Sequence, residues 1–177
     1  MLGLVIEKAS GQSYYDYVQQ HIFNVAHMTE SGSVPKSEKI HNLAVGYMRP
    51  EPGAPLTINA ETLPWRGSSA GGGDSTLGDL LRFDQALRHH KLLSVASTDM
   101  ILAGKVQAGP DPDRKYAYGF EDTRVVGRRI VGHGGGAPGM NAQLDMYLDN
   151  GMTVIVLSNL DPPAATQVAN YIRLRLP

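Results

Sequence analysis

Residues 130–160 read IVGHGGGAPGMNAQLDMYLDNGMTVIVLSNL, and this stretch decides the class of fold that the sequence predicts. Its second half contains two short β-type runs separated by Asn150-Gly151, which is a strong signal for a tight hairpin. Four such runs occur in the C-terminal third of the chain, at 116–125, 128–132, 141–148 and 152–160. We therefore expect an antiparallel meander in this part of the chain.

Helices are expected in the rest of the chain. A first helical segment ends at Gly11, and Ser13 and Thr76 are each followed three residues later by aspartate, a capping signature that opens two further helices. Asp161-Pro162 predicts a closing helix with Pro162 at its first position. Residues 29–73 are expected to form a long loop rich in Pro, Gly and Ser. This order of elements predicts an α+β fold.

The composition indicates a soluble globular protein and excludes several kinds of site. The chain has 177 residues, enough for one domain with a core, and its net charge of -1 does not favour nucleic acid or an anionic membrane as a partner. No cysteine is present, which excludes disulfides and thiolate chemistry. The longest apolar run, residues 154–157, is too short to cross a bilayer, and the first ten residues lack the features of a signal peptide. The compartment stays open.

The histidines do not predict a metal site. Five of the six show no i, i+4 pairing with a carboxylate nearby, and they are His21, His27, His41, His89 and His90. We therefore expect no metal ion and no cofactor.

The stretch GSSAG at residues 67–71 matches the G-x-S-x-G pattern of a nucleophile elbow, with Ser69 at the position of the nucleophile. An elbow needs an apolar strand before the serine and a helix directly after it. Here residues 61–66, ETLPWR, are not an apolar strand, and the next helix cap, Thr76, comes seven residues after the serine. The stretch is interpreted as a loop.

A second pattern, S-x-x-K, occurs at Ser33 to Lys36. This motif works when the serine and lysine share one face of a helix, so that the amine takes the hydroxyl proton. No apolar helical face follows Ser33, and its neighbours are polar. This motif too is interpreted as a polar loop.

The third pattern is HGGG at His133 to Gly136, directly after an apolar run that ends at Gly132. Bare backbone N–H groups at a strand edge are what an oxyanion hole requires, because glycine allows a carbonyl to approach closely. His133 is then placed to donate a hydrogen bond to a carboxylate or carbonyl of a ligand. A glycine-rich turn with an exposed histidine explains the same spacing, so both interpretations stay open.

Three segments of the chain resemble the serine β-lactamase-related superfamily, in particular the branch with class C β-lactamases, family VIII esterases and DD-peptidase-like proteins. They are LGLVIEKASGQSYYDYVQQHIF, SSAGGGDSTLGDLLRFDQAL and GHGGGAPGMNAQLDMYLDNGMTVIVLSNLD. The last segment is the most specific, because His133-Gly134-Gly135 matches the K-T-G or H-x-G box of the family. The resemblance implies a β-lactamase/transpeptidase-like fold.

The resemblance also implies a serine hydrolase that acts by acyl transfer on small esters, β-lactams or D-Ala peptides. In that mechanism the serine of S-x-x-K attacks, and a lysine and the tyrosine of Y-x-N move the proton. The box then gives His133 and Gly136 catalytic roles, Gly136 as a backbone oxyanion donor. Gly134 and Gly135 become substrate-binding residues.

The chain also departs from the family pattern. Y-x-N and S-x-x-K lie upstream of the segment that matches residues 2–11, whereas this chain has no Y-x-N and its only S-x-x-K is the loop at Ser33. The resemblance therefore implies the C-terminal part of such an enzyme, inactive alone, without nucleophile, lysine or tyrosine. The alternative is a non-catalytic pseudoenzyme module that binds a small carboxylate or peptide-like ligand at the glycine box.

We expect residues 1–110 to form a helical and loop part and residues 111–177 to form an antiparallel sheet with a closing helix. Together they make one incomplete β-lactamase-like domain. The expected partners are the small substrates named above and either a second copy of the chain or a missing N-terminal part, with no nucleic acid.

Overall fold

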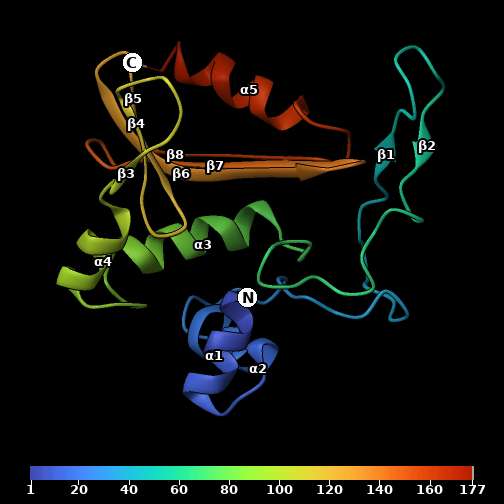
Figure 1. Cartoon of the computed structure of the whole chain (residues 1–177), viewed down its shortest axis with the longest axis horizontal. Coiled ribbons are helices and arrows are strands. Elements are labelled where there is room, and N and C mark those ends of the chain that lie inside the picture. Colours follow the sequence, from blue (N-terminus) through green and yellow to red (C-terminus); the bar gives the residue numbers. More distant parts are fainter. Residues whose placement is uncertain (177) are drawn as a thin grey trace. The chain divides into compact units, whose positions relative to one another are not determined.

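The computed structural model describes residues 1–176, which divide into two compact units (Figure 1). The first unit contains Met1–Val45 and Asn59–Leu92. The second contains Gly46–Ile58 and residues 93–176. Helices dominate the first unit and an antiparallel sheet dominates the second, so each is considered by itself below.

The first unit begins with α1 (Leu2–Ser10), α2 (Tyr14–Val18) and the π-helical turn η1 (Gln19–Phe23). Gly11 ends α1 in the left-handed region, with φ of 71°, where glycine carries no steric penalty. Ser13 caps α2, because its side chain accepts a hydrogen bond from the backbone N–H of Asp16. Both predicted boundaries are confirmed.

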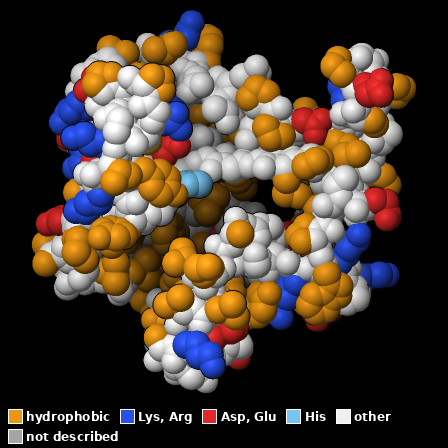
Figure 2. Space-filling model, in the orientation of Figure 1, with side chains coloured by type: hydrophobic (Ala, Val, Ile, Leu, Met, Phe, Trp, Pro, Cys, Tyr) orange, Lys and Arg blue, Asp and Glu red, His pale blue; other side chains and the backbone are white. Residues whose placement is uncertain are grey.

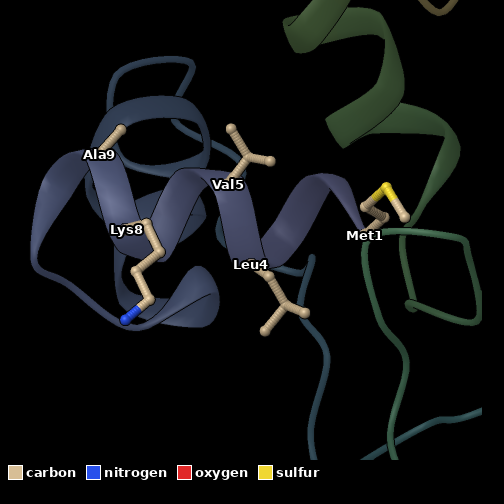
Figure 3. Close-up of a pocket in the computed structure, with 5 residues that line it drawn as sticks. All are labelled: Met1, Leu4, Val5, Lys8 and Ala9. Carbon is tan, nitrogen blue, oxygen red and sulfur yellow. The ribbon is translucent and has the colours of Figure 1, made fainter.

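The apolar side of α1 faces outward. Leu2 is 72% exposed, and Met1, Leu4 and Val5 line an open hollow on the helix surface (Figure 3). Figure 2 shows hydrophobic side chains at the surface in the region of α1 and α2. The buried residue of α1 is Gly3, whose N–H donates to Ser69 Oγ at 3.1 Å. The helical periodicity therefore predicts the helix but does not show which side of it is buried.

Helix α3 (Leu77–Arg88) begins at the predicted cap, since Thr76 Oγ1 accepts a hydrogen bond from Asp79 N at 3.2 Å. The small core of this unit contains Ala26, Met28 and Ala86, packed against Ile22, Phe23, Phe83 and Leu92. The buried carboxylate of Asp79 accepts hydrogen bonds from Glu30 N and Ser31 Oγ and pairs with Arg82. These bonds hold residues 30 and 31, at the start of the long loop, against α3.

The second unit contains a six-stranded antiparallel meander in the order β3-β4-β5-β6-β7-β8. The strands are β3 (Val106–Gln107), β4 (Arg114–Tyr116), β5 (Glu121–Val125), β6 (Arg128–Ala137), β7 (Met140–Tyr147) and β8 (Thr153–Ser158). The predicted α+β fold and meander are confirmed, and the chain turns at Asn150-Gly151, where Gly151 has φ of 77°. The run 116–125 is not one strand, because the chain turns between β4 and β5.

Several elements differ from the sequence prediction or were not predicted. Helix α4 (Val95–Leu102), capped by Ser94, was missed, and so was β3. The long loop contains a two-stranded ribbon of β1 (Tyr47–Met48) and β2 (Thr57–Ile58). The closing helix α5 (Ala164–Arg173) begins two residues after Pro162. Asp161 does not cap it with its side chain, because that carboxylate accepts hydrogen bonds from Arg49 N and Gly139 N.

Helix α5 packs along β7 and β8 through Ala165 and Ala169, both fully buried (Figure 1). A buried ion pair joins the helix to the sheet, since Arg173 donates to both oxygens of Asp145 at 2.6 Å. Burial alone would lower the pKa of Arg173, but the hydrogen bonds and charge of Asp145 outweigh it and raise that pKa. Gln143 Nε2 also donates to Asp145 Oδ1 at 2.7 Å. The pair fixes α5 on this face of the sheet.

We predict that Arg173→Leu will strongly destabilise the chain. The substitution leaves the carboxylate of Asp145, whose side chain is 1% exposed, buried without its partner charge. Breaking a buried pair in this way costs about 3–5 kcal/mol. Urea unfolding followed by circular dichroism measures the loss. The matched control is Arg175→Leu, which removes a guanidinium that stacks on Tyr171 and has no recorded acidic partner among residues 1–176. Equal losses in the two variants would contradict the role of the ion pair.

Candidate active site

The glycine box, His133–Gly136, lies inside strand β6, where that strand extends beyond its neighbour β5. The pairing of β5 with β6 ends at Glu121 and Gly132, whereas the pairing of β6 with β7 continues to Ala137 and Met140. Among residues 1–176, no strand pairs with His133–Ala137 on the β5 side. The box was expected after the strand, but it forms the second half of the strand and has one open edge.

An open strand edge presents unpaired backbone groups. Successive residues of a strand direct their N–H and C=O groups to opposite sides, so alternate residues of His133–Ala137 point away from β7. Such an edge can pair with an extended ligand or donate N–H groups to a carbonyl oxygen. Residues 133–137 are therefore a strand edge and not a loose glycine turn.

The three glycines after His133 are needed for different reasons. A Cβ at Gly134 would overlap Gln143 Oε1, and a Cβ at Gly136 would overlap Pro162 Cγ. A Cβ at Gly135 would meet no atom within 4 Å. Two of the glycines are therefore required by close packing on the α5 side of the sheet, and Gly135 faces open space.

Asn141, on the neighbouring strand β7, stabilises the box through hydrogen bonds, a role that the sequence analysis missed. It lies opposite Gly136 on β7, and its Nδ2 donates to Gly135 O at 2.7 Å. Its Oδ1 accepts from Ala165 N at 2.8 Å, at the start of α5. Asn141 is 5% exposed, so both contacts are shielded from solvent. The signal available in the sequence was a polar residue at the beginning of an otherwise apolar β-type run.

His133 is exposed at the beginning of the open edge. Its Nε2 lies 3.2 Å from the hydroxyl of Tyr116, and the two rings are in edge contact with centroids 6.1 Å apart. The sequence analysis assigned no role to Tyr116, which lies 17 residues earlier in the chain. The histidine ring is therefore held by a tyrosine from β4 beside the open backbone.

The serines of the two rejected motifs lie in the first unit. Ser69 Oγ accepts a hydrogen bond from Gly3 N, and Ser33 Oγ is buried without a hydrogen-bond partner among residues 1–176. The amine of Lys36 donates to the carbonyl oxygen of Ala60. Within residues 1–176, neither Ser33 Oγ nor Ser69 Oγ has a hydrogen bond to a lysine or histidine that would take its proton.

Within the described residues 1–176 there is no cluster of three His, Asp or Glu side chains suited to a metal ion. No helix in that range is long and apolar enough to span a membrane.

The antiparallel meander, with the glycine box on its partly open strand and α5 on one face, has structural neighbours of the β-lactamase/transpeptidase fold. The Beta-lactamase family model matches residues 1–176. Penicillin-binding protein 4* of Bacillus subtilis is 32% identical over an alignment that covers 90% of this chain and 38% of the relative. The chain belongs to this family, within the serine β-lactamase-related superfamily.

Solved structures agree with this assignment. A penicillin-binding protein from Bacillus halodurans matches with a TM-score of 0.88 and 30% identity over 98% of this chain and 53% of the other. A D-stereospecific amidohydrolase from Streptomyces shares the fold with a TM-score of 0.81, 23% identity and coverage of 98% and 52%. The chain spans 38% and 41% of the two curated relatives it matches.

We predict opposite outcomes for two alanine substitutions in the box. Gly136→Ala should destabilise the chain by about 1–3 kcal/mol, because the new methyl overlaps Pro162 and approaches Asn141 Nδ2 to 3.0 Å. Gly135→Ala should be neutral or stabilise by up to about 1 kcal/mol, because it meets open space and restricts the unfolded chain. Thermal unfolding of the two variants beside the parent measures both. Equal destabilisation would contradict the packing assigned to Gly136.

Proposed function

We propose that this chain is the C-terminal part of a serine hydrolase that acts by acyl transfer on small esters, β-lactams or D-Ala peptides. The nucleophilic serine, the lysine and the tyrosine would then come from residues other than these 177. The observation that carries the proposal is the open edge of β6 at His133–Ala137, bordered by an exposed histidine. The kinds of substrate follow the family, whose relatives include penicillin-binding proteins and a D-stereospecific amidohydrolase.

The open edge would stabilise the negative charge that develops during the reaction. As the serine attacks the carbonyl carbon, negative charge develops on the carbonyl oxygen, and a backbone N–H of the box donates to that oxygen. Gly136 is the residue to which the resemblance assigns this donor. One such donor contributes about 3–4 kcal/mol to the transition state. His133 would donate to a carboxylate or carbonyl elsewhere on the substrate and orient it.

The alternative function is that of a pseudoenzyme module that binds a small carboxylate or peptide-like ligand without chemistry. The open edge and His133 favour this candidate as well, because β4, β6 and β7 of the chain's own sheet build them. The two functions differ in whether a nucleophile is ever brought to the edge. Sequencing the coding region upstream of Met1 is a direct test: an in-frame S-x-x-K and Y-x-N supports the hydrolase, and a stop codon without them supports the module.

We predict that the isolated chain has no serine-hydrolase activity. An oxyanion donor stabilises charge only after a nucleophile has attacked, and an unactivated serine is a weak nucleophile. Nitrocefin and p-nitrophenyl ester assays should show no burst, and a fluorophosphonate probe analysed by mass spectrometry should label no serine. Stoichiometric labelling of Ser33 or Ser69, lost together with turnover in the matching alanine variant, would overturn the proposal.

We predict that His133→Ala weakens binding of a D-Ala-D-Ala dipeptide or a penicillin in calorimetric titration. His89→Ala is the control, because His89 is an exposed histidine of the first unit whose Nδ1 contacts Gln85 O at 2.7 Å. A hydrogen bond to a charged carboxylate contributes about 1.5–3 kcal/mol, so the loss should be at least about tenfold. If the missing residues are supplied, turnover should fall more in His133→Ala than in His89→Ala. Equal effects of the two substitutions would remove His133 from the site.

We predict that the chain associates through the outer edge of β8. This uncharged strand, Thr153–Ser158, pairs with β7 on one side, and within residues 1–176 no strand pairs along its other side. Such an edge invites pairing with another chain. A homologue from Pyrococcus abyssi, 23% identical with a TM-score of 0.84 over 97% of this chain and 40% of the other, is described as octameric.

Sedimentation velocity at micromolar concentration tests the association. The parent chain should sediment as a dimer or larger species. Leu157→Lys, on the edge strand, should shift it to a monomer, whereas Leu4→Lys on the exposed side of α1 should not. A compact monomeric parent would contradict the prediction, and dissociation by Leu4→Lys alone would move the contact from β8 to α1.

A further inference from the structure

We propose that Tyr116 is a positioning residue for His133. Its hydroxyl donates a hydrogen bond to Nε2 of the imidazole and so leaves the proton of the neutral ring on Nδ1, as the donor available to a ligand. The hydrogen bond between Tyr116 and His133 does not depend on any ligand. Its effect on binding rests on the binding role proposed above for the open edge of β6.

Tyr116 and His133 come from β4 and β6, at the end of the sheet where β5 begins. Tyr116 on β4 pairs with Glu121, and Glu121 pairs with Gly132 on β6. Since Glu121 is the first residue of β5, that strand is absent beside His133. With no β5 residue opposite His133, the tyrosine hydroxyl lies 3.2 Å from Nε2 of the imidazole.

The chemistry of the two groups gives the hydrogen bond a direction that matters. A neutral imidazole has one N–H donor and one acceptor nitrogen, and the bond at one nitrogen decides the state of the other. If the phenol donates to Nε2, Nδ1 carries the proton and donates to a carbonyl or carboxylate. If Nε2 donates to the phenol oxygen, Nδ1 becomes an acceptor, and the ring repels such a ligand. Only the first direction fits a site for carbonyl or carboxylate groups.

The neighbouring tyrosine provides a matched control. Tyr118 is 61% exposed, and its ring lies 5.9 Å from the amine of Lys105. Its hydroxyl has no recorded contact with His133. Tyr116→Phe and Tyr118→Phe each remove one hydroxyl and keep the ring, so the edge contact between the rings of Tyr116 and His133 is preserved in both variants.

Nitrogen-15 NMR of the histidine rings tests the direction without any ligand. Spectra are recorded at several pH values, and those in which the histidine signals no longer change with rising pH are compared. His89 is an internal reference for a protonated Nδ1, because that atom lies 2.7 Å from the carbonyl oxygen of Gln85, which cannot donate. His41, an exposed histidine, is the reference for a ring in solvent.

In the parent chain, the Nδ1 and Nε2 shifts of His133 should match the pattern of His89. Tyr116→Phe should move them toward the pattern of His41, and Tyr118→Phe should leave them unchanged. A protonated Nε2 in the parent, or the same spectrum in Tyr116→Phe, would overturn the proposal. Because a general loss of structure would shift many resonances, unchanged signals of His89 and His41 establish that the effect is local.

Calorimetric titration with D-Ala-D-Ala separates this contact from the proposed function. Tyr116→Phe should weaken binding about fivefold, the factor that matches about 1 kcal/mol for one hydrogen bond, while Tyr118→Phe binds as the parent does. A tautomer change in Tyr116→Phe with no binding by the parent upholds the contact and rejects the proposed binding function. Binding by the parent with no tautomer change in the variant rejects the contact and leaves that function in place.

Discussion

The pairing of β6 with β7 beyond the beginning of β5 is the constraint on which the candidate site depends. Without it, His133–Ala137 would be a loop, and its N–H groups would have no fixed direction. Asn141 secures this pairing, since one amide joins the carbonyl of Gly135 to the first turn of α5. The same extension lets Tyr116 reach His133. Because β6 extends beyond β5, the box has an open edge, its backbone is fixed by β7, and His133 contacts Tyr116.

Local signals in the sequence predicted the elements whose ends depend on local contacts. Ser13 and Thr76 cap helices through their own side chains, and Gly151 turns a hairpin with its own φ angle. Predictions failed where a distant partner decides. Asp161 reads as a helix cap, but its carboxylate is taken by Arg49 N and Gly139 N, and α5 begins later. Competition from long-range hydrogen bonds cannot be read from a capping pattern.

The candidate site follows the same division. The residues of the box were found by pattern, because a histidine followed by glycines after an apolar run is compact in sequence. Tyr116 and Asn141 were not found, since each acts on the box through a strand register that periodicity does not provide. The sequence also did not show that the box continues β6, because glycine has low strand propensity and reads as the end of a strand.

The glycines of the box therefore need two explanations. Gly134 and Gly136 leave room for Gln143 and Pro162 on the α5 side of the sheet, a packing requirement that would hold in a protein without any ligand. Gly135 has no such neighbour among residues 1–176, so packing within this part of the protein does not account for it. In a strand, glycine without a packing role destabilises relative to alanine, and it is tolerated where another backbone or a ligand must come close. Gly135 is consequently the glycine that packing within residues 1–176 does not require, and it adds to the open edge of β6 as an argument for a ligand there.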